Sequence, residues 1–192
     1  MEINLICSGN TIDDLTEKEI EFINSKRCIF VNKSGLINKK IPMKQDDFLI
    51  MNDGIPNYQE IFFEHKTEKV PYIFIFPNNM YRMLEMVYRI DFNNHINKTI
   101  SYDYLHEGES TSAMALSYLV ENGYKKINVF GLDMNGEGFS GKSKVRNYNY
   151  KPFFFERNIE FITEKSIEWN KKSNIILRTK SKLNCFEFLK IK

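Results

Sequence analysis

Apolar residues along the chain gather in six short runs, separated by segments with helical spacing. The runs are nearly continuous and rich in β-branched side chains, which is typical of strands buried on both faces of a parallel sheet. They span residues 3–7, 28–32, 48–52, 72–76, 127–130 and 174–177. Apolar positions recur with a helical period in residues 14–24, 80–90, 112–120 and 154–172. This alternation predicts an α/β fold with a Rossmann-like, mostly parallel sheet flanked by helices.

Two of the predicted helices carry boundary signals. Thr16 followed by Glu19 predicts a capping box at the start of the first helix. Asn122 and Gly123 predict the end of the helix over residues 112–120, because glycine readily takes the left-handed backbone that closes a helix.

Length and composition indicate a single domain over residues 1–192, with 42% hydrophobic and 14% aromatic residues to fill its core. Lys and Arg total 27 against 25 Asp and Glu, so the charge does not require a nucleic-acid partner. No apolar run reaches the length of a membrane span and no basic segment precedes the first run, so we expect a cytoplasmic protein. Cys7, Cys28 and Cys185 follow no motif and are expected to be small core residues in a reducing compartment.

Polar residues and glycines follow five of the predicted strands at the point where each strand ends, in residues 8–11, 32–34, 52–54, 77–79 and 131–133. Ligands of open α/β sheets bind at the carboxyl ends of the strands, so these segments predict a binding site. Asn32 and Asn52 offer a donor and an acceptor to a base edge or to ribose hydroxyls. Gly9 allows close approach of a backbone to a ligand, and the amides of a helix starting near Asp14 are candidate phosphate donors. Asn and Gly are common in turns, so each segment alone would be an ordinary turn.

Two further segments suggest function. Residues 109–113 place hydroxyl groups at the start of a helix, which suits an anion, although N-capping is the simpler interpretation of those residues taken alone. Residues 133–152 fit neither a strand nor a helix, and they combine three glycines with several basic residues and with Tyr148 and Tyr150. They predict a lid-like loop within the domain.

Several familiar signatures are missing. There is no Gly-x-Gly-x-x-Gly fingerprint and no Walker loop, and the three histidines do not fall at metal-binding spacings. The Asp13-Asp14 and Asp46-Asp47 pairs are better explained as a cap and a solvated turn than as metal ligands. An Asp-x-Asp motif of the kind that holds a divalent ion and a sugar nucleotide is also missing. The sequence therefore predicts chemistry without a metal or another cofactor.

Three blocks of sequence resemble the bacterial sialyltransferases of glycosyltransferase family 42, which include the Campylobacter lipooligosaccharide enzymes. They are Leu5-Ile-Cys-Ser-Gly-Asn10, Phe30-Val-Asn32, and the block from Thr111 to Asp133 with its Gly123-Tyr-Lys-Lys-Ile-Asn-Val-Phe-Gly131-Leu-Asp133 strand. The last block is the most specific. In the first, Thr11-Ile12 stands where the family has Gly-Pro. The resemblance covers about two thirds of the chain, its nucleotide-binding framework.

The resemblance implies a GT-A-like fold that binds a CMP-activated sugar without a metal. Carried over by position, it places Gly9 and Asn10 at the phosphate or ribose, and Asn32 and Asn52 at the nucleotide or sugar. It likewise implies that Thr111 and Ser112 lie against the cytidine or phosphate, with Gly131 and Asp133 at the ribose or base. Tyr148 and Tyr150 fall in the loop that corresponds to the family's lid, whose tyrosines steady the leaving phosphate. The family's relatives also imply a homo-oligomer.

The general base is where the chain departs from the resembled family. The family uses a histidine after its lid, and this chain has no histidine after His106. An acceptor hydroxyl still needs a group to take its proton, and the candidates are His106, Glu107, Asp133 and Glu156.

The sequence thus predicts an inverting, metal-independent glycosyltransferase that moves a sugar from a nucleotide donor, with CMP the expected nucleotide, to a hydroxyl of a surface glycan. Attachment of this cytoplasmic protein to the surface of the inner membrane is an open alternative for its location. One alternative is a phage-type enzyme that glycosylates modified DNA, which the basic and aromatic residues of the lid-like loop would suit. The other is a nucleotide-sugar-binding protein that has lost catalysis together with the family's histidine.

Overall fold

The computed structural model of the chain describes residues 1–32, 34, 40–44, 46–51, 70–77, 96–102, 110–135 and 152–191. Within these residues, eight strands form one sheet in the order β5-β4-β3-β2-β1-β6-β7-β8, and all neighbouring strands run parallel. The strands are β1 (Glu2–Ile6), β2 (Cys28–Val31), β3 (Phe48–Ile50), β4 (Val70–Pro77), β5 (Ile96–Tyr102), β6 (Lys126–Phe130), β7 (Asn174–Leu177) and β8 (Glu187–Phe188). The predicted α/β fold with a parallel sheet is confirmed.

Each of the six predicted strands is present within two residues of its expected bounds. Strands β5 and β8 were not predicted. The sequence of β5 mixes apolar residues with four polar ones instead of forming a continuous apolar run. Strand β8 has two residues, and both side chains are exposed. Both lie at the edges of the sheet, where burial on two faces is not required.

The described helices are η1 (Asn10–Ile12), α1 (Glu17–Asn24), α6 (Thr111–Glu121) and α7 (Pro152–Lys172). The predicted capping box is confirmed, because the Glu19 amide donates to the Thr16 hydroxyl and the Thr16 amide donates to the Glu19 carboxylate. Helix α1 therefore begins at Glu17, three residues after the predicted start at residue 14. The binding of a phosphate by its first amides stays a prediction. The predicted helix over residues 80–90 lies outside the described residues.

Helix α6 ends as the sequence predicted. Gly123 takes a left-handed backbone with φ of 78°. Its amide donates to the Val120 carbonyl at 3.1 Å, and the Tyr124 amide donates to the Leu119 carbonyl at 3.1 Å. These two bonds form a Schellman motif, which satisfies the last carbonyls of the helix.

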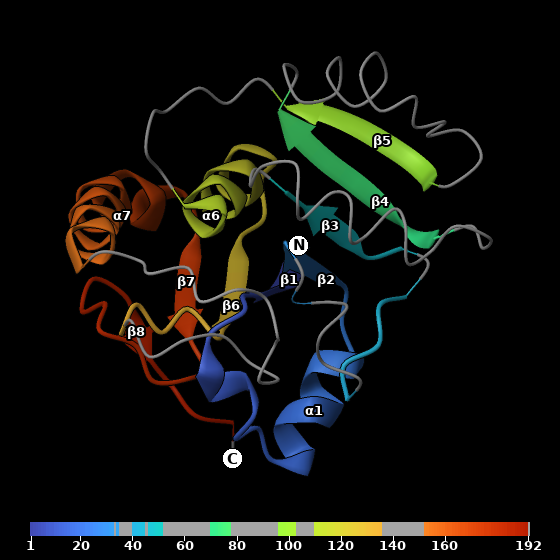
Figure 1. Ribbon diagram of the computed structural model, residues 1–192, viewed down its shortest axis with the longest axis horizontal. Coiled ribbons are helices and arrows are strands. Elements are labelled where there is room, and N and C mark those ends of the chain that lie inside the picture. Colours follow the sequence, from blue (N-terminus) through green and yellow to red (C-terminus); the bar gives the residue numbers. More distant parts are fainter. Residues whose placement is uncertain are drawn as a thin grey trace.

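Helices α6 and α7 cover one face of the sheet and α1 covers the other (Figure 1). Alternate residues of each strand face opposite layers. Leu5 and Ile29 join the cluster that packs under α6 and α7, with Trp169 of α7 only 4% exposed. On the opposite face, the Phe22 ring of α1 lies 6.4 Å from the Phe130 ring of β6.

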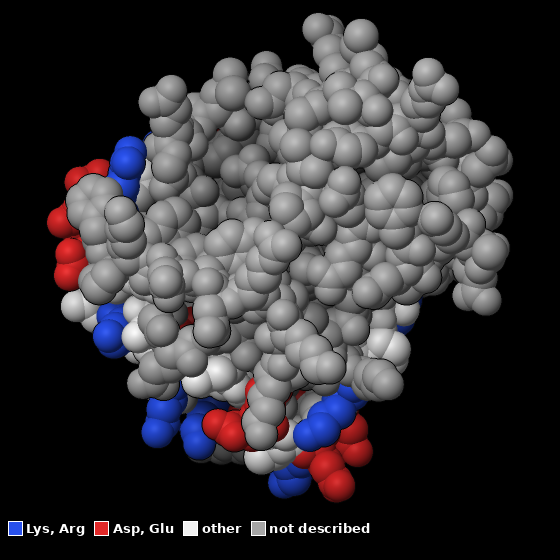
Figure 2. Space-filling view, viewed as in Figure 1, with Lys and Arg blue, Asp and Glu red and all other residues white. Residues whose placement is uncertain are grey.

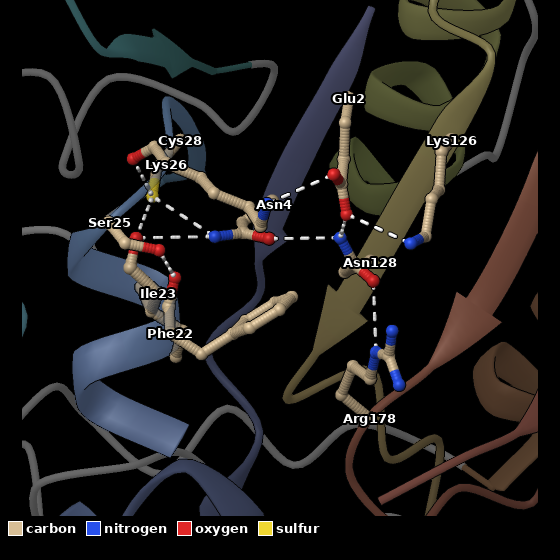
Figure 3. Close-up of polar contacts among 10 residues, drawn as sticks. All are labelled: Glu2, Asn4, Phe22, Ile23, Ser25, Lys26, Cys28, Lys126, Asn128 and Arg178. Carbon is tan, nitrogen blue, oxygen red and sulfur yellow. Dashed lines mark hydrogen bonds and ion pairs between the residues drawn. The ribbon is translucent and has the colours of Figure 1, made fainter. Parts of the chain in front are cut away.

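A buried polar network interrupts the apolar core on the α1 face (Figure 3). Asn4 of β1 and Asn128 of β6 are register partners and both are fully buried. The Asn128 amide group donates to Asn4 Oδ1 at 3.2 Å and to Glu2 Oε1 at 3.0 Å. Arg178 donates through Nε to Asn128 Oδ1 at 2.9 Å and through Nη1 to the Leu189 carbonyl at 2.9 Å. The network therefore ties the register of β1 and β6 to the chain that follows β8.

Glu2 gives this network a pH dependence. The Glu2 carboxylate accepts a hydrogen bond from Asn128 and pairs with the Nζ atoms of Lys26 at 3.0 Å and Lys126 at 3.2 Å. These contacts lower the pKa of Glu2 from 4.5 to about 2. A lowered pKa stabilises the fold above pH 4.5, and this stabilisation is lost as pH falls toward 2. We expect Glu2→Gln to lower the free energy of unfolding by about 1–2 kcal/mol at pH 7, because Glu2 is partly solvated, and by less at pH 3. Urea unfolding at both pH values measures the difference.

Glu168 provides the matched control for Glu2. It pairs with Lys172 one helical turn away at 2.6 Å, and both side chains are exposed. We expect Glu168→Gln to leave stability nearly unchanged at either pH. An equal loss in both variants would contradict the role assigned to the buried network.

The Asp46-Asp47 pair differs from its predicted solvated turn. Asp46 is exposed, but Asp47 is only 1% exposed. Its two carboxylate oxygens accept from the Cys28 amide and from the Lys44 amide, each at 2.8 Å. The prediction was wrong for Asp47, which joins the start of β2 to the chain leading into β3.

Charged side chains of the described residues are mixed in sign on the face shown in Figure 2. Lys and Arg side chains lie beside Asp and Glu side chains along the left and lower rim of the molecule. The described residues visible there form no patch of one sign, in keeping with the nearly balanced composition.

Candidate functional site

The order of the strands places a switch point between β1 and β6. From β1 the chain builds the sheet outward through β2, β3, β4 and β5, and then returns to the other side of β1 with β6. Connections leave the carboxyl ends of β1 and β6 in opposite directions, which is where open α/β sheets bind ligands. The predicted residues after these two strands therefore meet at the expected edge.

Hydrogen bonds join the loop after β1 to the loop after β6. The Gly9 amide donates to the Gly131 carbonyl at 2.9 Å. The Thr11 amide donates to Asp133 Oδ2 at 2.9 Å, and the Thr11 hydroxyl donates to Asp133 Oδ1. Asp133 is 4% exposed, so this carboxylate is a buried acceptor held by one residue through two bonds.

Glycine is required at positions 9 and 131 because the two loops touch. A Cβ on Gly9 would lie 2.5 Å from the Gly131 carbonyl oxygen and would collide with the Asp133 carboxylate. Gly131 has φ of 68°, and a Cβ there would lie 2.7 Å from the Cys7 carbonyl oxygen. The close approach predicted for Gly9 is thus made to the protein's own β6 loop, whereas its contact with a ligand stays a prediction.

The end of β2 is joined to the start of α6. Asn32 takes a left-handed backbone with φ of 52°, which is uncommon for a residue with a side chain. Its amide donates to the Ile50 carbonyl at 2.9 Å, and its side-chain Nδ2 donates to the Thr111 hydroxyl at 3.2 Å. Strained backbone of this kind is concentrated at functional sites.

The start of α6 is anchored on both sides. The Ser110 hydroxyl accepts from the Ala113 amide at 3.2 Å, so the capping predicted for this segment is confirmed. The Ser110 amide donates to Oδ1 of Asn158, a buried residue of α7, at 2.8 Å. The positive end of the α6 dipole therefore lies fixed beside Asn32.

Cys7 lies at the same edge as a buried thiol. Its thiol is 2% exposed, and burial raises the pKa of Cys7 to about 12, although a hydrogen bond with Ser112 opposes the rise. The thiol is therefore protonated at neutral pH. Cys28 is also buried, and burial raises its pKa to about 12. Cys7 and Cys28 are thus core residues as predicted, whereas Cys185 is half-buried, and all three cysteines are free.

A segment that the sequence analysis missed supports the β6 loop from its far side. The Gly131 amide donates to the Thr179 hydroxyl at 2.8 Å, and the Ser181 hydroxyl donates to the Leu132 carbonyl. The Lys182 amide donates to the Asp133 carbonyl at 2.9 Å. These residues follow β7, so the rule that polar residues gather after strands would have found them if applied to the last predicted strand.

The remaining predicted residues fall in different places. Asn10 is half-buried beside Thr11 in η1, and Ser112 is half-buried in the first turn of α6. Glu156 is exposed in the second turn of α7. His106, Asn52, Tyr148 and Tyr150 lie outside the described residues, as does most of the lid-like loop, residues 136–151.

Within the described ranges, no group of three or more His, Cys, Asp and Glu side chains is placed to hold a metal ion. None of the described helices combines the length and the apolar character needed to cross a membrane. No family model matches the chain, and neither a curated protein nor a solved structure does.

Proposed function

We propose that the chain is a metal-independent glycosyltransferase that binds a nucleotide-activated sugar, of the CMP type, at the carboxyl edge of β1, β2 and β6. The observation that carries the proposal is the left-handed Asn32 joined to Thr111 at the start of α6. This arrangement places a carboxamide and a helix N-terminus side by side at the edge where such sheets bind ligands. A base or ribose edge would hydrogen-bond to Asn32, and the α6 dipole would favour the nearby phosphate.

The reaction follows from what these groups can do. The acceptor oxygen attacks the anomeric carbon while the bond to the phosphate oxygen breaks, which inverts the configuration. Negative charge then grows on the departing phosphate, and the positive end of α6 stabilises that charge. The proton of the acceptor hydroxyl passes to a base, for which His106, Glu107, Asp133 and Glu156 are the candidates.

A panel of nucleotides tests the proposal directly. The purified protein is heated with CMP, CDP, UDP and GDP and with their sugar derivatives, because a ligand of the folded state raises the melting temperature. At a concentration one hundred times Kd, we expect CMP ligands to raise it by about 5 °C or more. A selective shift with UDP or GDP would replace CMP in the proposal, and no shift with any member would overturn it.

Turnover separates an enzyme from a binding protein. CMP release from a CMP-sugar in the presence of glycan acceptors is expected for an enzyme. The largest fall in kcat among the variants His106→Asn, Glu107→Gln, Asp133→Asn and Glu156→Gln then locates the base. Tight binding without turnover on any acceptor would favour the non-catalytic alternative. A DNA acceptor is distinguished by binding that weakens steeply with salt.

Asn32→Gly is the sharpest single test of the binding site. Glycine removes the carboxamide and keeps the left-handed backbone without strain, so folding is little disturbed. We expect the Kd for CMP to rise about tenfold or more with the loss of hydrogen bonding to the ligand. Isothermal titration calorimetry measures this change.

Asn122→Ala is the matched control for Asn32, since Asn122 caps the opposite end of α6 and its Nδ2 donates to the Tyr118 carbonyl at 2.8 Å. This variant should lose some stability and keep its affinity for CMP. Unchanged affinity in Asn32→Gly would remove Asn32 from the binding site.

A further inference from the structure

Thr11 is half-buried and joins two loops that are 122 residues apart in the chain. Its amide and its hydroxyl each donate to a different oxygen of the buried Asp133 carboxylate. Two bonds from one residue to both oxygens set the rotation of the carboxylate as well as its position. A hydrogen bond to a charged group in a buried place is also stronger than one between neutral groups.

The β6 loop is held from its other side as well. Gly131 donates to Thr179, and the Asp133 carbonyl accepts from Lys182. The β1 loop has a second tie through Gly9, whose amide donates to Gly131. Asp133 therefore lies between a rigid support after β7 and the loop after β1, and Thr11 of that loop donates to both of its carboxylate oxygens.

We infer that Thr11 is a positioning residue of the ligand site: it locks the β1 loop and the Asp133 carboxylate into one unit. This inference rests on the proposed function for the identity of the ligand. Asn10 precedes Thr11 directly and is half-buried at the same edge, so the lock also holds Asn10 in place. With both oxygens accepting from Thr11, the Asp133 carboxylate is held in one position at the edge of the proposed nucleotide-sugar site.

Three variants of Thr11 test, through ligand binding, whether its bonds to Asp133 position the site. Thr11→Val removes the hydroxyl at nearly constant shape, Thr11→Ser restores it, and Thr11→Ala serves if the valine variant does not fold. We expect Thr11→Val to raise the Kd and the KM for the CMP ligand about tenfold with kcat within about twofold. Thr11→Ser should return both constants to within about twofold of the parent protein.

Ser173→Ala is the control for a purely structural loss. The Ser173 hydroxyl donates to the Tyr124 carbonyl at 2.6 Å and joins the chains before β6 and β7, at the opposite edge of the sheet. This variant should lose stability, as Thr11→Val does, and keep the Kd for CMP. If Thr11→Val also keeps the parent's Kd while losing stability, Thr11 has a structural role alone and the inference is overturned.

Hydrogen exchange tests, without any ligand, whether Thr11 holds the loops after β1 and β6 together. In Thr11→Val, amides of residues 8–12 and 131–135 should exchange about tenfold faster than in the parent, whereas residues 174–177 should not change. Equal exchange in both proteins would overturn the inference. If the parent protein binds no nucleotide, the proposed function fails, and faster exchange in the two loops would still establish the lock.

Discussion

Replacing Gly131 by alanine is expected to lower the free energy of unfolding by about 3–5 kcal/mol. Gly131 has φ of 68°, where a side chain is strained in any surroundings. A new Cβ would also lie 2.5 Å from Ile12 Cγ1 and 2.7 Å from the Cys7 carbonyl oxygen. The backbone of Cys7 directly follows the central strand β1 and cannot move without disturbing the sheet. The free-energy costs of the backbone strain and of the steric collision therefore add. Urea unfolding followed by circular dichroism measures the loss.

Gly123→Ala separates these two contributions. Gly123 has a similar φ of 78°, but a Cβ there would meet nothing within 4 Å. This variant therefore carries the backbone strain alone, which corresponds to about 1 kcal/mol. If both variants lose the same free energy, the contact between the β1 and β6 loops is looser than the structure indicates.

The second large effect is expected at Asp47. Its two oxygens accept from the amides of Cys28 and Lys44, and the side chain is 1% exposed. Asparagine keeps one acceptor and turns an NH₂ group toward the other amide, which leaves that amide without a partner. We expect Asp47→Asn to lower the free energy of unfolding by about 2–4 kcal/mol at pH 7. Thermal and urea unfolding both report the change.

Asp46→Asn is the control for Asp47, because the neighbouring side chain is exposed and the change in charge is the same. It should alter the free energy of unfolding by less than about 0.5 kcal/mol. Similar losses in the two variants would assign the effect to charge and not to the buried hydrogen bonds.

The pH dependence of Asp47 has the opposite sign to that of Glu2. Burial raises the pKa of Asp47 above 3.8, although the two amide bonds oppose the rise. The folded state then holds the proton more tightly than the unfolded state, so stability from this group falls as pH rises from 3.8 through the raised value. We expect this slope in the parent protein and its absence in Asp47→Asn, measured as the difference between their unfolding free energies across that range.

The candidate site depends on the same kind of long-range contact. Thr11 with Asp133, and Asn32 with Thr111, anchor the carboxyl edge on either side of β1. Each pair joins a strand end near the start of the chain to a segment beyond residue 110. The site is therefore assembled only when β6 has been placed beside β1.

Local features of the chain were determined by the sequence itself. The apolar runs located six strands, and the Thr16–Glu19 pair and Gly123 marked helix boundaries where the structure has them. These signals depend on residues within one or two turns of each other, so periodicity and capping chemistry reveal them. The rule for strand ends also brought Gly9 and Asp133 to one edge before their contact was known.

Partnerships across the fold were decided by the tertiary structure. Asp47 looked like a residue of a solvated turn and is a buried acceptor. Thr179 and Ser181 reach the β6 loop because β7 lies beside β6, which the residues around them in sequence do not reveal. The same holds for Asn4 and Asn128, which interrupt apolar runs and meet only because β1 and β6 are neighbours in register. A side chain's own neighbours in sequence do not say which strand will lie beside it. Burial and hydrogen-bond partners at these positions therefore follow from the order of the strands in the sheet.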